Sequence, residues 1–259
     1  IGQPAHAWVC GQLARAWGHA DFGPFAPWEE VCLAAEQHDI GMAAWECAPT
    51  LNAPNGRPHS FMDLPKGPHM GMFHHASRLL APQSRYAALL TSLHFTRLAG
   101  FYDPSTGTAD DTRAVEGYLA AEREWQAATL RGLRADPHYA PHAAPEVVDR
   151  NRRLIVAWDR LSLNLCMGLR APVAIPDVPT AEGATMLTLT PAGGDPSRTL
   201  VAPWPFARDE VTMICEGRRL ARGKNRRRRN REKLRRRDSF HTVSLRAVDH
   251  GTAAAHPFS

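Results

Sequence analysis

The sequence lacks several features that would place it in particular classes of protein. Its five cysteines are widely spread and include no CxxC pair, which argues against a zinc ribbon or a disulfide framework. No run approaches the ~20 continuous apolar residues that cross a bilayer. The start, residues 1–17, lacks the basic and apolar regions of a secretory signal. We therefore expect a cytoplasmic protein with no membrane segment and with free, buried thiols.

Positive charge is scarce outside one stretch of the chain. Residues 218–238 hold 13 of the 31 lysines and arginines and have a net charge of +11. The whole chain has a net charge of +5, which leaves −6 for the remainder. Such a run can bind phosphate backbones, but this one has no interleaved aromatic side chains to stack on bases. We interpret it as a charged loop and do not expect nucleic acid as a partner.

Hydrophobic periodicity predicts a mainly α fold with a small β appendage. Apolar residues recur at helical spacing in six segments, which are residues 5–17, 27–39, 69–80, 86–99, 111–134 and 146–168. After about residue 170, three prolines indicate a linker, and short β-like runs follow. We predict a helical domain over residues 1–170. Residues 171–259 would form a linker and a small β-rich region that includes the basic loop 218–238.

The segment most informative about chemistry is LAAEQHDIGMAAWE, residues 33–46. It places His38 and Asp39 at the end of an apolar helix, just before Gly41. Neighbouring side chains on a helix diverge by about 100°, so both can reach one metal ion only where the helix ends. Gly41 supplies that ending. Imidazole and carboxylate ligands without thiolate suit a first-row divalent metal.

This pattern resembles the signature of the HD-domain superfamily of metal-dependent enzymes. Two further residues fall in the order that the superfamily uses, namely His6 in the first predicted helix and Asp159 in the last. The resemblance covers residues 1–170 and implies an HD-like helical bundle. It also implies that His6, His38, Asp39 and Asp159 bind one or two ions of Fe, Mn, Zn or Ni.

Members of the superfamily that bind two metal ions add two histidines between the His-Asp pair and the last Asp. His94 lies in an otherwise apolar helix, and His69 precedes it by 25 residues. The resemblance therefore implies His69 and His94 as further ligands or as groups that face the substrate. The adjacent His74 and His75 remain the alternative to His69.

The chain is also similar to an uncharacterised bacterial branch of HD-like proteins. Four segments support this similarity, which are QHDIG, an SxH helix at 92–94, a DRLSL helix at 159–163 and PWPF at 203–206. The branch strengthens the expected fold and adds no activity.

The resemblance implies a metal-dependent hydrolase that acts on a phosphorylated small molecule. A metal-activated water would be the nucleophile, and Glu36 would orient it. HDIG is often followed by a lysine that contacts phosphate, whereas this chain has Met42. Arg57, Lys66 and Arg97 are the candidates to bind substrate in its place.

Two other interpretations stay open. The ligand order also fits HD-type di-iron oxygenases, which cleave C–C or C–P bonds with O₂. Alternatively, the chain is a non-catalytic binding protein with a degenerate site. The identity of the metal separates these interpretations, and the sequence does not.

Overall fold

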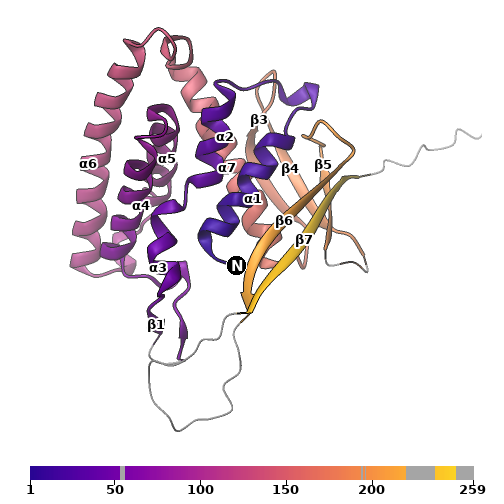
Figure 1. The fold of residues 1–259 in the computed structure, drawn as a ribbon, viewed down its shortest axis with the longest axis horizontal. Helices are drawn as coiled ribbons and strands as arrows, with labels where there is room; N and C mark the ends of the chain where they lie inside the picture. Colours follow the sequence, from indigo (N-terminus) through magenta and orange to yellow (C-terminus); the bar gives the residue numbers. More distant parts are fainter. Residues whose placement is uncertain (53–55, 194, 196, 220–236, 249–259) are drawn as a thin grey trace, which may run out of the picture.

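The computed structural model describes residues 1–52, 56–193, 195, 197–219 and 237–248 (Figure 1). Of the predicted basic loop, residues 220–236 lie outside this range. The helices form one layer, and a β-sheet packs against one side of it. The α-helices are α1 (Gln3–Ala16), α2 (Trp28–Gln37), α3 (Ala43–Cys47), α4 (Lys66–Leu80), α5 (Arg85–Ala99), α6 (Ala109–Arg134) and α7 (Pro145–Met167). Short 3₁₀ turns connect them, of which η2 (Ile40–Met42) and η3 (Phe61–Asp63) border the site described below.

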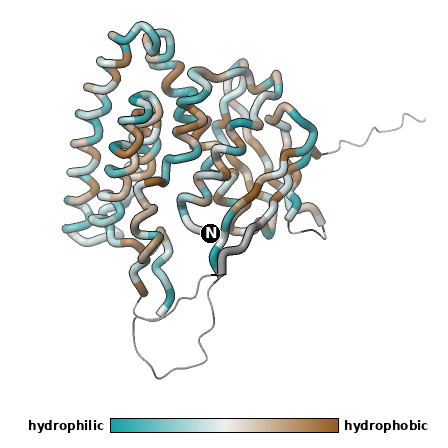
Figure 2. Tube along the Cα trace, viewed as in Figure 1, coloured by the Kyte–Doolittle hydropathy of each residue, from teal (hydrophilic) through white to brown (hydrophobic). Residues whose placement is uncertain are grey.

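The six predicted helices are confirmed, and local sequence explains where several of them begin. Ser84 accepts a hydrogen bond from the backbone N–H of Ala87 and so caps α5. Thr108 and Asp111 form a capping box at the start of α6. Along α6, hydrophilic and hydrophobic residues alternate in Figure 2, as expected of a helix with one side in solvent.

The prediction of a mainly α fold with a small β appendage is wrong. Five strands form one curled half-barrel sheet in the order β3-β4-β5-β7-β6. Strands β5 and β7 pair in parallel and their neighbours pair antiparallel. The strands are β3 (Val173–Pro179), β4 (Ala184–Pro191), β5 (Arg198–Ala202), β6 (Glu210–Arg219) and β7 (Arg237–Ala247). A two-stranded sheet, β1 (Leu51–Asn52) with β2 (Arg57–Pro58), lies elsewhere.

The sheet and the helices share one large hydrophobic core, and a second, smaller core lies between α4, α5 and α6. β6 packs on α1 and β3 packs on α7, and the inward side chains of the strands are buried with those of the helices. Trp158 of α7 is fully buried at the centre of this core. Trp17 and Phe25 contact its ring with centroid distances of 5.8 Å and 5.3 Å. The sheet is therefore part of the main core, and a division of the chain into two domains at residue 170 stays a prediction.

Strand β3 was not predicted from the sequence because it contains prolines. Residues 173–179 were expected to be a linker, because Pro176 and Pro179 cannot donate hydrogen bonds to a sheet. Strand β3 tolerates them because it is an edge strand. A register shift between Ile175 and Val178, with Asp177 at a φ of 62°, accommodates Pro176. Ile175 and Val178 remain buried on either side of this irregularity.

The PWPF segment joins the sheet to the end of the first helix. Phe206 forms a β-bridge with Trp17, and their rings meet edge to face at 5.5 Å. The carbonyl of Pro205 accepts hydrogen bonds from the backbone N–H groups of Gly18 and His19, both at 3.1 Å. This segment therefore has a structural role in closing the shared core.

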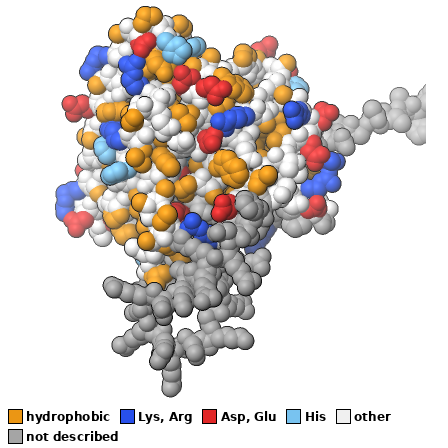
Figure 3. Space-filling model, viewed as in Figure 1, with side chains coloured by type: hydrophobic (Ala, Val, Ile, Leu, Met, Phe, Trp, Pro, Cys, Tyr) orange, Lys and Arg blue, Asp and Glu red, His pale blue; other side chains and the backbone are white. Residues whose placement is uncertain are grey.

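The described surface shows mixed charge. On the face seen in Figure 3, basic and acidic side chains are interspersed among the coloured residues. None of the helices in the described part of the chain combines the length and apolar character of a membrane-spanning segment. The expectation about nucleic acid stays a prediction.

Gly41 lies where η2 touches the backbone of α4. A Cβ atom at this position would be 2.1 Å from the carbonyl oxygen of Met72 and 2.7 Å from the amide nitrogen of Ala76. Both atoms belong to the backbone of a helix and cannot move aside alone. Only glycine allows this approach, which holds α4 against the turn that follows Asp39.

We expect Gly41→Ala to lower the free energy of unfolding by at least about 2 kcal/mol, because the added methyl group overpacks the contact. Gly71→Ala in α4 is the matched control, since a Cβ there meets nothing within 4 Å. We expect this control to raise the free energy of unfolding by about 0.5–1 kcal/mol through helix propensity. Chemical denaturation measures both. Equal effects of the two substitutions would contradict the close contact.

Candidate metal centre

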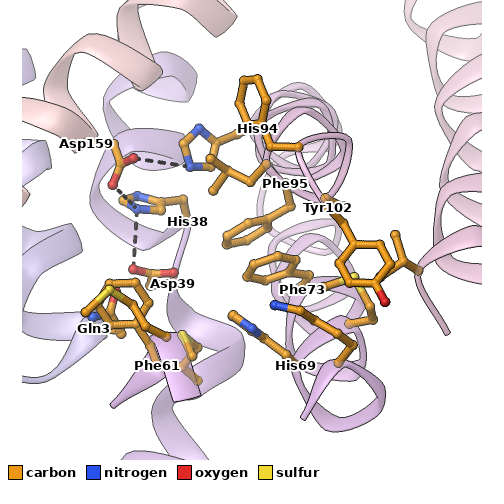
Figure 4. A pocket seen from close by; sticks show the side chains of 18 of the residues that line it. Gln3, His38, Asp39, Phe61, His69, Phe73, His94, Phe95, Tyr102 and Asp159 are labelled. Atoms are coloured by element: carbon orange, nitrogen blue, oxygen red, sulfur yellow. Dashed lines mark ion pairs between the residues drawn. The ribbon is translucent and has the colours of Figure 1, made fainter. Parts of the chain in front are cut away.

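Five of the predicted ligands are buried close to one another between four helices, and Figure 4 shows four of them, His38, Asp39, His94 and Asp159. The five are His6 of α1, His38 and Asp39 at the end of α2, His94 of α5 and Asp159 of α7. Helix α2 ends at Gln37, and Asp39 has left the helical conformation with φ −91° and ψ 11°. The prediction that the helix ends at the His-Asp pair is confirmed.

The side-chain atoms of this cluster lie within a few tenths of an ångström of the separations expected of ligands around one ion. His6 Nε2 is 2.9 Å from Asp159 Oδ1, and His38 Nε2 is 3.4 Å from Asp39 Oδ2. The Nε2 atoms of His38 and His94 lie 3.7 Å and 3.8 Å from the oxygens of Asp159. Two ligands that each lie about 2.1 Å from a metal are about 3–3.5 Å apart. The cluster can thus close around an ion with small movements.

Hydrogen bonds orient two of the imidazoles toward the centre of the cluster. Ser162 donates its hydroxyl hydrogen to the carbonyl of His6 at 2.9 Å, so it accepts a hydrogen bond from His6 Nδ1 at 2.7 Å. His38 Nδ1 donates to the carbonyl of Ala35 at 2.9 Å. Each ring therefore presents Nε2 to the cluster. Metal-binding histidines typically donate their other ring N–H to the protein in this way.

Buried nitrogen atoms without hydrogen bonds lie within this cluster. His38 Nε2 and both ring nitrogens of His94 are buried and lack a hydrogen-bond partner among the described residues. An unsatisfied buried polar atom is costly and calls for an explanation such as a bound ion. The donor set and these unpaired atoms together fit a metal ion.

The charges in the cluster shift the pKa values of its members. Burial raises the pKa of Asp39, against the opposing effect of His38. Burial also disfavours ionisation of Asp159, but the nearby His38 and a hydrogen bond with His6 outweigh it and hold the pKa of this carboxyl far below its usual range. For His6, burial lowers the pKa, while Asp159 and Asp39 raise it more, to about 10. Burial lowers the pKa of His94 to about 3.

Cys10 belongs to the same cluster and was missed in the sequence. His6, Cys10, His38 and Asp159 offer ligand atoms that all lie within 4.8 Å of one another, so this buried group could hold a metal ion. Cys10 follows His6 by four residues on α1, which places both on one face of the helix. That spacing was the available signal. Burial raises the pKa of the Cys10 thiol, which hydrogen-bonds to the carbonyl of Trp158 at 3.5 Å.

His69 lies apart from these residues and lines the cavity onto which the cluster opens. The cavity has a volume of about 380 Å³, and His38, Asp39, His94 and Asp159 line it as well. The His69 ring contacts Phe73, with a centroid distance of 4.4 Å. Burial and the nearby Lys66 lower the pKa of His69 to about 4. It therefore contributes a neutral imidazole to the cavity at neutral pH.

The alternative pair His74–His75 is not part of the cluster. His74 Nδ1 lies 2.8 Å from the carboxylate of Glu122, which is fully buried and also pairs with Arg78 at 2.9 Å. His75 donates a hydrogen bond from Nδ1 to the carbonyl of Gly71. The contacts of Glu122 with His74 and Arg78 join α4 to α6, whereas the hydrogen bond of His75 lies within α4.

Of the remaining predicted site residues, one lines the cavity and three do not. Lys66 lines the cavity. Arg97 lies in a separate hollow with Arg152 and Arg160, and Arg57 lies in β2 and does not line the cavity. Glu36 is ion-paired with Arg15 and is absent from the cavity lining, so it is not placed to orient a water there.

Comparison with known proteins gives one match. A family model described as "Protein of unknown function (DUF3891)" matches residues 1–222. No curated protein and no solved structure matches the chain.

The neutral state of His69 makes a prediction about acid stability. Its pKa is about 4 in the folded protein and about 6.5 when unfolded. The unfolded chain therefore binds more protons between these values, so His69 destabilises the fold as pH falls from 6.5 to 4. We expect His69→Gln to remove up to about 3 kcal/mol of this loss. Denaturation of metal-free protein at a series of pH values measures it.

His138→Gln is the control, because the His138 side chain is 68% exposed. It should follow the wild type at every pH. Parallel stability curves for wild type and His69→Gln would show that His69 is not held neutral.

Proposed function

We propose that this chain, which belongs to the DUF3891 family, is a metal-dependent hydrolase of the HD type. The description of the family assigns no activity, so the proposal rests on the site. The hydrolase would act on a phosphorylated small molecule and bind one divalent transition metal, Fe, Mn, Zn or Ni. The ligands would be His6, His38, Asp39, His94 and Asp159.

The observation that supports this proposal is that two buried imidazoles at the cavity wall have Nε2 atoms without a hydrogen bond. His38 and His94 are each 1% exposed, line the cavity, and present Nε2 to carboxylate oxygens without a hydrogen bond. Buried nitrogens without a partner call for an explanation, and a bound ion beside these carboxylates supplies one. The cluster therefore has the properties of a binding centre that faces a ligand.

Chemistry at this centre is divided between the bound ion and the protein. When bound, a divalent ion lowers the pKa of a water ligand and polarises a phosphoryl oxygen. Asp39 and Asp159 supply the negative charge that retains the ion. Lys66 supplies a positive charge to the same cavity and is placed to bind an anionic substrate. It would replace the lysine for which this chain has the buried Met42.

The number of ions depends on His69. His6, Asp39, His38 and His94 lie close to one another around Asp159, whereas His69 lines another part of the cavity. This arrangement favours a single ion. A second iron would instead support the di-iron oxygenase interpretation.

We expect purified protein to bind about one ion per chain after separate loading with Fe, Mn, Zn or Ni, and to hydrolyse phosphomonoesters with one of them. His38→Ala and Asp159→Ala should lose both properties, because each removes a ligand. Elemental analysis and release of inorganic phosphate measure them. His138→Ala, which removes a surface histidine, is the control and should match the wild type.

Unchanged metal content in both ligand variants would disprove the site. Two Fe per chain without phosphate release would replace the hydrolase by an oxygenase. No bound metal under any loading condition would leave a non-catalytic binding protein.

Ser162→Ala tests the orientation of His6 separately. Loss of its hydroxyl frees the His6 ring to rotate, and we expect metal affinity to fall by about 10–100-fold. Competition with a chelating dye measures the affinity. An unchanged affinity would show that Ser162 does not position His6.

A further inference from the structure

The cavity beside the metal centre is mostly apolar. Away from the cluster its wall is made by aromatic, methionine and aliphatic side chains from α4, α5, η3 and the loop after α5. Phe73 and Phe95 stack at 4.0 Å with an interplanar angle of 12°. In Figure 4 these two rings lie between the ion-paired cluster and Tyr102. A substrate at the metal centre would therefore extend along an aromatic surface.

The rim of the cavity is apolar as well. Met62 is 68% exposed, Phe101 is 64% exposed and Leu98 is 37% exposed, and all three line the cavity. Large apolar side chains grouped on a surface typically mark a binding site. These residues can cover the outer part of an apolar ligand without any change in the core.

Charge is sparse in this cavity. Among the described residues that line it, Lys66 is the single lysine or arginine. Lys66 Nζ also lies 5.8 Å from the centre of the Tyr102 ring. Sites for nucleoside polyphosphates place several cations or a phosphate-binding loop around the phosphates. Here, one lysine and one metal site can balance a single phosphate group.

Away from the cluster, the neutral side chains in the wall that can form hydrogen bonds are those of Gln3, His69 and Tyr102. Tyr102 has the one hydroxyl among the cavity-lining residues, and it is hydrogen-bonded to Thr112 at 3.2 Å. Nucleobases are distinguished by hydrogen bonds to their edges, and stacking alone does not separate them. The cavity is thus suited to select a ligand by its shape and by its apolar surface area.

We propose that the substrate is the phosphate monoester of an apolar alcohol, aromatic or branched, that lies against Phe73, Phe95 and Phe101. The reaction rests on the proposed hydrolase function, whereas the ligand class rests on the cavity alone. Water adds to phosphorus and the ester P–O bond breaks. The alcohol leaves with a proton from that water, and inorganic phosphate is the second product. A cavity of about 380 Å³ holds a small ligand of this kind.

The test uses two probes, 1-naphthol and 1-naphthyl phosphate. We expect 1-naphthol to bind the metal-free protein, as measured by its fluorescence. The double variant Met62→Ala/Phe101→Ala should weaken this binding about tenfold, because apolar contact area is lost. The control Leu79→Ala/Met186→Ala removes two similarly exposed apolar side chains that do not line the cavity. It should bind naphthol like the wild type.

Hydrolysis by metal-loaded protein forms the second arm. We expect kcat/KM for 1-naphthyl phosphate to exceed that for adenosine monophosphate, and Lys66→Gln to weaken binding of the phosphate ester while naphthol binding stays unchanged.

Each outcome has a separate meaning. Naphthol binding that is absent, or equally affected by both double variants, would overturn the apolar ligand class. A preference for adenosine monophosphate would also overturn it. Specific naphthol binding without hydrolysis under any metal would support the apolar ligand class and disprove the hydrolase.

Discussion

The structure depends on one buried carboxylate. Asp159 lies at the middle of α7, and three imidazoles from α1, α2 and α5 surround its oxygens. An uncompensated buried charge costs several kcal/mol, so the helices that provide these imidazoles have to meet at this point. The packing of the bundle and the geometry of the candidate metal centre therefore have the same physical origin. Because α7 also packs on the sheet, the site is connected to the whole core.

One side of the cavity is apolar and the other is the polar cluster, and the apolar side strengthens the electrostatic interactions of the cluster. Apolar side chains such as Phe95 exclude water from the neighbourhood of His94 and Asp159. In the resulting low dielectric, interactions between charged groups are stronger than in water. The same exclusion makes unpaired ligand nitrogens costly when no ion is bound. An apolar cavity wall is thus a condition for tight binding at the polar centre.

Much of the site could be predicted because its polar residues occur in segments that are otherwise apolar. A His-Asp pair at a helix end and His94 on an apolar helix are both expensive to bury without a function. His69 was chosen by its interval in the sequence, and an interval does not determine the direction of a side chain. It points into the cavity beside Phe73, whereas Cys10 was overlooked although it shares a helix face with His6. The sheet was underestimated because Pro176 disguises an edge strand. The pairing of β5 with β7 also joins residues over 40 positions apart, which local patterns do not contain.

Gly41 has a consequence for how the site responds to its ligand. Its contact with α4 leaves no space between the turn after Asp39 and the backbone at Met72 and Ala76. Phe73, which follows Met72 in α4, forms part of the cavity wall. Movement of α4 at Phe73 would therefore meet the backbone of the turn that follows Asp39. If a ligand in the cavity and an ion at the cluster displace this turn differently, each would change the binding of the other by the same factor.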